Sequence, residues 1–271
     1  MTIDILSDLH LDFYFKTPGV DADTVQTRLS HVFKDHTPAN ILIVAGDLGH
    51  DNDQNVVILH YLKQIYGYRY IVCVLGNHDY YLISTTHKSN YSFKSINRVV
   101  GMRNLINAQE DMFCLDGEII EIEGIRIGGC DSWYDGSYIK KHFNRTDDTW
   151  INQLWKYSLN DANYILGIPW QDLWQQEKEK IEKIYQEVDI MITHVNPSIA
   201  KKHTDPKYQE ELTTGFFCFN GEKYLKQGSM KYWIYGHTHD AMEYELHGVK
   251  CICNPLGYPG EGNSNLYSII L

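Results

Sequence analysis

The most conspicuous absence from this chain of 271 residues is a long apolar segment. No apolar run approaches the roughly 20 residues that a membrane-spanning helix needs, so we expect no membrane span. The N-terminus also lacks the basic stretch and the following apolar stretch of a secretion signal, because Met1 leads almost directly into a strand-like pattern at residues 3–6. The sequence therefore predicts a cytoplasmic protein.

Cysteine is scarce and scattered. The chain has six, most of them in strand-like contexts: Cys73, Cys114, Cys130, Cys218, Cys251 and Cys253. The Cys251-Ile252-Cys253 spacing does not match a zinc finger, and the set does not look like a disulfide framework. We expect these residues to pack in the core as reduced thiols, which agrees with a cytoplasmic location.

Basic residues are outnumbered, and arginine is rare. The formal net charge is −11, and the six arginines are Arg28, Arg69, Arg98, Arg103, Arg126 and Arg145. Because Lys and Arg contacts to phosphates dominate the affinity of proteins for long nucleic acids, the composition argues against that activity. A nucleotide or a short nucleic acid remains compatible as a substrate. The surplus of carboxylates suits a site that binds divalent cations.

No linker rich in proline, glycine or serine divides the chain, and its apolar content of 43% is enough for a sizeable core. We predict one domain over residues 1–271. In its first half, short apolar strands at residues 3–6, 41–45 and 70–75 alternate with helical patterns at about 22–35 and 54–66. Such strands are buried on both faces, as is typical of βαβ units.

The second half has a different pattern. Residues 113–130 indicate strand, turn and strand, with Asp116-Gly117 and Glu123-Gly124 as turn signals. Residues 147–187 are helical in character, and Pro169 is expected to divide them into two helices. Further strands are predicted at residues 188–193, 232–235, 243–246, 249–253 and 266–271. The whole pattern predicts mixed α/β layers around a central pair of sheets.

Five short motifs that can bind metals each follow an apolar run. They are Ser7-Asp8-Leu9-His10, Gly46-Asp47-Leu48, Gly76-Asn77-His78-Asp79, Thr193-His194 and Gly236-His237-Thr238-His239. Together they supply three oxygen ligands and four imidazoles, with His78 as an additional histidine. This set fits two divalent ions that share one carboxylate, an arrangement suited to attack on a phosphate ester.

The placement of these motifs favours a single site. Residues i and i+2 of an extended segment point to one side, so Asp8 with His10, and His237 with His239, are each expected to face the same site. The glycines in three of the motifs allow sharp turns and close approach of the backbone to ligands. Sites in open α/β sheets gather at the carboxyl ends of strands, where all five motifs are predicted to lie.

The order Asp-x-His, Gly-Asp, Gly-Asn-His-Asp, His and Gly-His-x-His, from Asp8 to His239, resembles the calcineurin-like metallophosphoesterase superfamily. The resemblance implies an α/β fold, a four-layer α/β/β/α sandwich. It also implies that Asp8, His10, Asp47 and His239 hold one metal ion. Asp47, Asn77, His194 and His237 would then hold a second ion, with Asp47 as the bridge. A hydroxide between the two ions would attack phosphorus.

The resemblance gives the remaining two residues of the third motif catalytic roles. His78 would protonate the leaving oxygen or stabilise the charge that develops there, and Asp79 would orient His78. Ligands of the Asp, Asn and His types without cysteine suit two divalent ions in open coordination. We expect Mn²⁺ first, with iron, Zn²⁺, Ni²⁺ and Mg²⁺ as alternatives.

Two departures from the family pattern bear on substrate. The arginine that follows the second motif in the protein phosphatases of this superfamily is absent, which shifts the expected substrate towards phosphodiesters, because arginine clamps favour dianionic monoesters. Many relatives have aspartate at the position of His50, which we expect either at the rim of the site or on the surface.

A cap over the metal site is expected at about residues 131–186, where the aromatic residues are dense. They are Trp133, Tyr134, Tyr138, Trp150, Trp155, Trp170 and Trp174. Their rings either pack the cap onto the body or stack on a flat leaving group. Trp133 and Tyr134 are the candidates for substrate contact, with Phe216 and Phe217 on the same rim.

The sequence thus predicts a hydrolase of phosphate esters that depends on two metal ions and acts on phosphodiesters or nucleotides. Three alternatives stay open: a phosphatase for small-molecule or protein monoesters, a nuclease of the same superfamily, and a scaffold that binds proteins without catalysis. The predicted partner is a phosphate-ester small molecule, and the sequence does not specify an oligomeric state.

Overall fold

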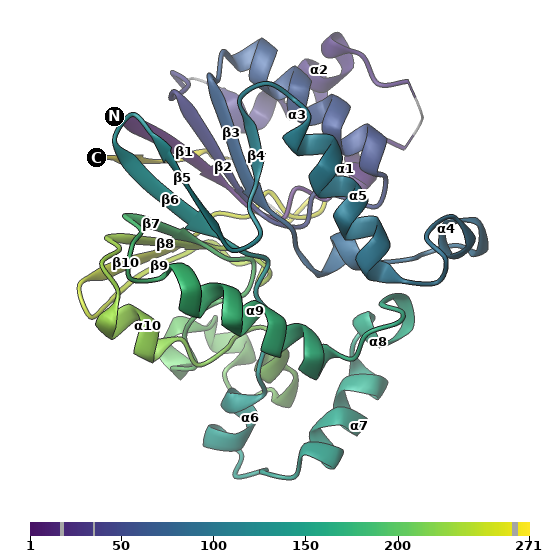
Figure 1. The fold of residues 1–271 in the computed structure, drawn as a ribbon, viewed down its shortest axis with the longest axis vertical. Coiled ribbons are helices and arrows are strands. Elements are labelled where there is room, and N and C mark those ends of the chain that lie inside the picture. The colour runs from purple at the N-terminus through teal and green to yellow at the C-terminus, as the bar shows by residue number, and fades with distance from the viewer. Residues whose placement is uncertain (17–18, 35, 262–264) are drawn as a thin grey trace.

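The computed structural model describes residues 1–16, 19–34, 36–261 and 265–271. Two β-sheets lie face to face, and helices cover their outer faces (Figure 1). This is the four-layer α/β/β/α arrangement expected from the sequence. In the described ranges, no helix combines the length and the apolar character needed to cross a membrane.

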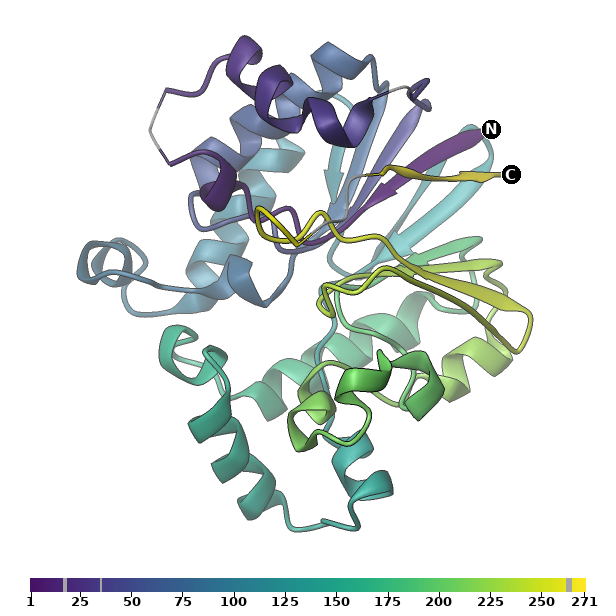
Figure 2. The same cartoon turned by 180° about the vertical axis from the view of Figure 1, so that it is seen from behind.

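The first sheet has five strands in the order β11-β1-β2-β3-β4. The parallel strands are β1 (Thr2–Leu6), β2 (Ile41–Ala45), β3 (Tyr70–Val74) and β4 (Met112–Cys114). Strand β11 (Tyr267–Ile270) runs antiparallel to β1, so the two chain termini lie side by side (Figure 2). The helical connections between the parallel strands are α1 (Leu11–Tyr14), α2 (Ala22–Phe33), α3 (Asn52–Tyr66), α4 (Thr85–Asn90) and α5 (Ser95–Asn107).

The second sheet has six strands in the order β5-β6-β7-β8-β10-β9. They are β5 (Glu118–Ile122), β6 (Ile125–Gly129), β7 (Ile190–Ile192), β8 (Tyr232–Tyr235), β10 (Val249–Cys253) and β9 (Met242–Leu246). The four central strands are parallel, and β5 and β9 form antiparallel edges. The helices of this half are α6 (Ser137–His142), α7 (Asp148–Ser158), α8 (Asp161–Tyr164), α9 (Trp170–Ile184) and α10 (Glu222–Gln227).

The alternation of side chains along the strands produces two apolar layers. Ile3 and Ile5 of β1, with Ile43 of β2, point between the two sheets, where they meet isoleucines of the second sheet. The intervening Leu42 and Val44 of β2 point to the helix side. Because both faces of these strands are buried, they read as continuous apolar runs in the sequence.

The predicted strands all form, and the turn at Glu123-Gly124 connects β5 and β6 as a hairpin in which both residues have positive φ. The helices differ from the prediction in two ways. Residues 147–187 form three helices instead of two, because the chain becomes extended at Leu159 before α8 as well as at Pro169 before α9. Five short or irregularly patterned helices form where none was predicted: α1, α4, α5, α6 and α10.

The helices after β6 lie in two different places. Helix α9 packs against β5 and β6 and belongs to the outer layer, whereas α6, α7 and α8 project beyond the sheets (Figure 1). Between β7 and β8, the chain forms three short 3₁₀ helices, Lys201–His203, Pro206–Tyr208 and Leu212–Phe216. The projecting helices and these 3₁₀ turns lie on the side of the sheets where the parallel strands end.

Candidate metal centre

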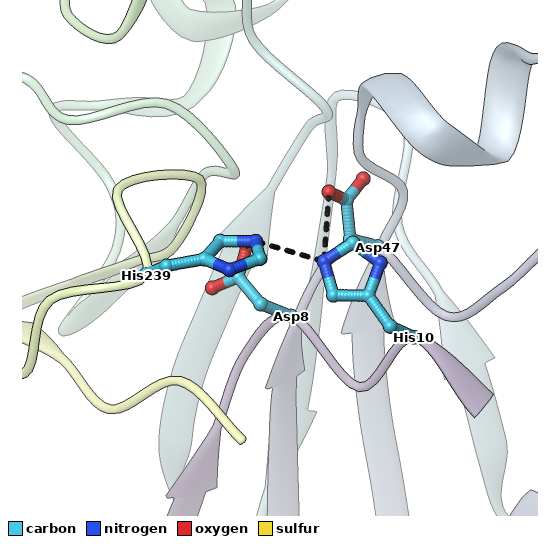
Figure 3. A group of neighbouring side chains, drawn as sticks. All are labelled: Asp8, His10, Asp47 and His239. Carbon is cyan, nitrogen blue, oxygen red and sulfur yellow. Dashed lines mark hydrogen bonds and ion pairs between the residues drawn. The ribbon is translucent and has the colours of Figure 1, made fainter. Parts of the chain in front are cut away.

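The five sequence motifs meet at the carboxyl ends of the parallel strands. Asp8 and His10 follow β1, Asp47 follows β2, and Asn77 begins a 3₁₀ helix (Asn77–Tyr80) after β3. His194 follows β7, and the pair His237 and His239 follows β8. Figure 3 shows four of these side chains turned towards one another from both sheets. Segments more than 200 residues apart in sequence thus form one site, as the strand-end argument predicts.

The backbone at these motifs is turned, and the prediction that Asp8–His10 and His237–His239 are extended is wrong. Five residues of the ligand set have positive φ: Asp8 (51°), His10 (42°), Asp47 (55°), His237 (70°) and His239 (53°). L-residues other than glycine rarely adopt this left-handed region. Such strain persists where the surrounding structure imposes it, which is characteristic of functional sites.

A first group of potential ligands comprises Asp8, His10, Asp47 and His239, whose ligand atoms all lie within 4.8 Å of one another. The Nε2 atoms of His10 and His239 are 2.8 Å apart. His10 Nε2 is 3.7 Å from Asp47 Oδ2, and His239 Nε2 is 3.8 Å from Asp8 Oδ1. These four side chains can hold one divalent ion.

A second group comprises Asp47, His194 and His237, and Asn77 lies beside it. His194 Nε2 is 3.4 Å from Asp47 Oδ1 and 3.1 Å from Asn77 Oδ1. Asp47 therefore presents Oδ2 to the first group and Oδ1 to the second. A carboxylate in this position could bridge two ions, one in each ligand group.

Hydrogen bonds on the far side of three rings select the nitrogen that faces the site. His194 Nδ1 donates to the Ala45 carbonyl oxygen (2.8 Å), and His237 Nε2 donates to the Phe216 carbonyl oxygen (3.0 Å). His239 Nδ1 donates to Glu261 Oε2 (2.8 Å). In its neutral form, each ring would keep the lone pair of its other nitrogen for a ligand, as is common among metal-binding histidines.

The electrostatics of the buried site require a positive charge. Burial would lower the pKa of His194, but the Asp47 carboxylate outweighs it and raises that pKa to about 10. Burial would likewise raise the pKa of Asp47, but His194 and His78 hold it well below its usual range. A proton on His194 Nε2, which faces Asn77 Oδ1 (3.1 Å) and Asp47 Oδ1 (3.4 Å), can supply this charge, and a divalent ion would take its place. The donor set thus fits divalent metal ions.

Two glycines make room for the ligands. A Cβ at Gly76 would collide with Asp47 Oδ1 and the His194 ring, and a Cβ at Gly46 would collide with the same ring. Gly46 also has a φ of 86°, a conformation that favours glycine. These contacts explain why the strand-to-loop transitions of the second and third motifs begin with glycine.

His78 lies beside both ligand groups without belonging to either. Its backbone N–H donates to Asp47 Oδ1 (2.9 Å), and its ring packs edge-on against His10 with ring centroids 4.6 Å apart. Among the described residues, Nδ1 of His78 has no hydrogen-bond partner. Burial lowers the pKa of His78, so the ring is largely neutral at pH 7.

Asp79 does not make the contact expected of it. Its carboxylate accepts backbone N–H groups of Leu48 (3.1 Å), Gly49 (3.2 Å) and Gly76 (2.8 Å). In the part of the chain that the structure describes, no hydrogen bond joins it to the His78 ring. Burial, reinforced by the charge of Asp47, raises the pKa of Asp79 to about 6. Asp79 therefore fixes the two ligand loops, and its effect on His78 is through the backbone.

A cavity of about 410 Å³ opens from the metal centre. Its lining includes Asp47, Asn77 and His78 together with Leu159 and Phe217. A volume of this size suits a small molecule.

Of the expected substrate contacts, only Phe217 lines this cavity. Trp133, Tyr134 and Phe216 do not line it, because all three rings are fully buried in the apolar core. His50 lies outside the cavity, with Nδ1 2.8 Å from Asp12 Oδ2, although its ring stacks on His78 at 5.4 Å.

Several residues at the site were missed by the sequence analysis. The Tyr258 ring stacks on His10 with centroids 4.4 Å apart, and Glu261 orients His239. Asp161 of α8 reaches Asn77 from the projecting helices. None of these three belongs to a motif, and each reaches the site only through tertiary structure.

A two-sheet α/β sandwich with ligands for two ions at its strand ends defines a class of metal-dependent phosphoester hydrolases. In agreement, the family model for calcineurin-like phosphoesterases matches residues 1–241. The chain belongs to this family, whose members are enzymes with a binuclear metal centre.

Similar proteins cover almost the whole chain. The uncharacterized protein L509 of Acanthamoeba polyphaga mimivirus is 27% identical over 279 residues, which span 98% of this chain and 94% of that protein. Among solved structures, the phosphopantetheinyl hydrolase of Mycobacterium tuberculosis superposes with a TM-score of 0.69 at 14% identity, covering 99% of this chain and 95% of that one. At 14% identity, this similarity to the phosphopantetheinyl hydrolase shows a shared fold.

Proposed function

We propose that this metal-dependent phosphoesterase hydrolyses phosphodiesters of small molecules. The observation that carries the proposal is the cavity lining: none of the described residues that form it is lysine or arginine. The sequence also places no basic residue among residues 262–264, which follow the lining residue Glu261. The cavity volume and the net charge of −11 both favour a small substrate over long nucleic acid.

The two ligand groups support defined roles for their side chains. Asp8, His10, Asp47 and His239 would hold one ion, and Asp47, Asn77, His194 and His237 the other. Two divalent ions in such a site lower the pKa of bound water and offset charge on phosphoryl oxygens. Oxygen and imidazole donors without thiolate suit Mn²⁺.

His78 is placed to act on the leaving group. The ring faces the cavity beside both ligand groups, and its lowered pKa makes it a neutral hydrogen-bond donor at pH 7. A neutral N–H aimed at the departing oxygen stabilises the negative charge that develops there as the ester bond breaks. This is the role we propose for His78.

The nearest arginines cannot clamp a dianion. Arg98 is fully buried and donates to the carbonyl oxygens of His78 (2.8 Å) and Gly49, and Arg103 pairs with Asp131. A monoester dianion has three terminal oxygens that share two negative charges, and the lining already carries the carboxylates of Asp240, which pairs with Lys207 (2.8 Å), and Glu261, which pairs with His239 (2.8 Å). A diester replaces one of these oxygens with an uncharged ester oxygen, so its transfer into this cavity is less costly.

The expected substrate preference can be measured with aryl esters. On protein stripped with EDTA and reloaded with Mn²⁺, we expect kcat/KM for bis(p-nitrophenyl) phosphate to exceed that for p-nitrophenyl phosphate by about tenfold or more, the equivalent of one missing charge-assisted hydrogen bond. Leu159→Lys, which adds an ammonium group to the lining, should shift the ratio towards the monoester. Ile83→Lys, outside this cavity, should leave the ratio unchanged. Monoester preference in the unmodified protein would overturn the proposal.

A further inference from the structure

Asp161 is a buried carboxylate without a cationic partner. It is the first residue of α8, and its side chain has no exposed surface. It accepts hydrogen bonds from Asn77 Nδ2 (2.8 Å), Tyr81 Oη (2.6 Å) and Tyr134 Oη (2.8 Å). No ion pair involving Asp161 is found among the described residues. Because a buried charge with only neutral donors is costly, a compensating charge is expected nearby.

A metal ion bound by Asn77 would supply this charge, because the Asn77 amide would then lie between the ion and Asp161. The Asn77 amide donates from Nδ2 to Asp161 and presents Oδ1 to His194 Nε2 at 3.1 Å. A flipped amide would place its NH₂ group at the ligand position, where it could not bind a cation. The carboxylate of Asp161 accepts only, so it selects the useful orientation. Donation to an anion also polarises the amide and makes its oxygen a better ligand.

The same carboxylate connects the projecting helices to the metal centre. Tyr134 Oη, which donates to Asp161, accepts a hydrogen bond from Trp155 Nε1 of α7 (2.5 Å). Tyr81, the third donor, packs against the His78 ring with centroids 4.4 Å apart. Asp161 thus accepts hydrogen bonds from three side chains with different surroundings. Asn77 lies at the second ligand group, Tyr81 packs on His78, and Tyr134 is hydrogen-bonded to α7.

We propose that Asp161 is a positioning residue that sets the amide orientation of Asn77 and thereby the affinity of the second metal site. This makes the projecting segment around α8 part of the metal centre as well as a wall of the cavity. The proposal rests on the proposed function, in which Asn77 is a ligand of the second ion.

The test is Mn²⁺ binding to Asp161→Asn, which keeps the shape of the side chain and removes its charge. We expect the second Mn²⁺ to bind about 10–100-fold more weakly, the range typical when a partner of a metal ligand is lost, while the first Mn²⁺ binds as before. Tyr134→Phe is the matched control. It removes another hydrogen bond of Asp161 but leaves the bond to Asn77, so it should lower the melting temperature without weakening the second site.

A double variant distinguishes orientation from general stability. A carboxylate at position 77 has two equivalent oxygens and no orientation to select, so Asn77→Asp combined with Asp161→Asn should restore binding of the second Mn²⁺. Failure of this rescue, or normal second-site affinity in Asp161→Asn, would overturn the positioning role. Asn77→Ala separates the two proposals: if it leaves second-site affinity unchanged, the ligand role of Asn77 itself is wrong.

Discussion

Asp47→Asn is expected to remove both metal ions at micromolar concentrations and with them the turnover of phosphodiesters. The carboxylate presents one oxygen to each ligand group, at 3.7 Å from His10 Nε2 and 3.4 Å from His194 Nε2. The amide of asparagine has no charge and only one oxygen. Loss of a buried charge that pairs with cations typically costs about 3–5 kcal/mol, which weakens binding by two to more than three orders of magnitude.

Metal content after desalting, measured by mass spectrometry, checks this expectation. Asp240→Asn is the matched control, because Asp240 lines the same cavity and belongs to neither ligand group. It should keep two ions. Retention of two ions and near-normal turnover in Asp47→Asn would refute the bridging assignment.

His78→Ala is expected to keep both ions and lose turnover by about 10²–10⁴-fold. The ring is not part of either ligand group, but it borders both and lines the cavity. The loss should increase with the pKa of the leaving alcohol, because a poor leaving group carries more charge as it departs. A series of aryl and alkyl diesters measures this dependence.

The outcome that contradicts a role for His78 is an unchanged rate with the poorest leaving group. His87→Ala provides a control for the loss of an imidazole, since His87 lies outside the cavity that contains the metal centre. This variant should retain the activity of the unmodified protein across the whole series.

The location of the metal centre could be predicted from the sequence because each candidate ligand follows an apolar strand. Parallel strands place their carboxyl ends at one edge, so Asp8, Asp47, Asn77, His194 and His237 had to converge once the strands were recognised. The backbone conformation at the ligands could not be predicted in the same way. The left-handed conformations at the ligands depend on contacts such as that of His237 N–H with Asp8 Oδ1 (2.8 Å), which join segments far apart in the chain.

The surroundings of the centre could not be predicted for a related reason. Trp133 and Tyr134 lie in the loop shortly after β6, yet the chain turns both rings into the core, and no periodic pattern specifies the direction of a loop side chain. Asp161 and Glu261 reach Asn77 and His239 from 84 and 22 residues away. Partners of this kind are visible only in the folded chain.

The most direct test of the binuclear centre is the electron paramagnetic resonance spectrum of the EDTA-stripped protein titrated with Mn²⁺. Bridging by Asp47 predicts two ions bound per chain and, at the second equivalent, a spectrum of two exchange-coupled ions, since bridged ions lie roughly 3.5–4 Å apart. Saturation at one ion, or two ions with independent spectra, would contradict the shared carboxylate and with it the proposed hydrolytic site.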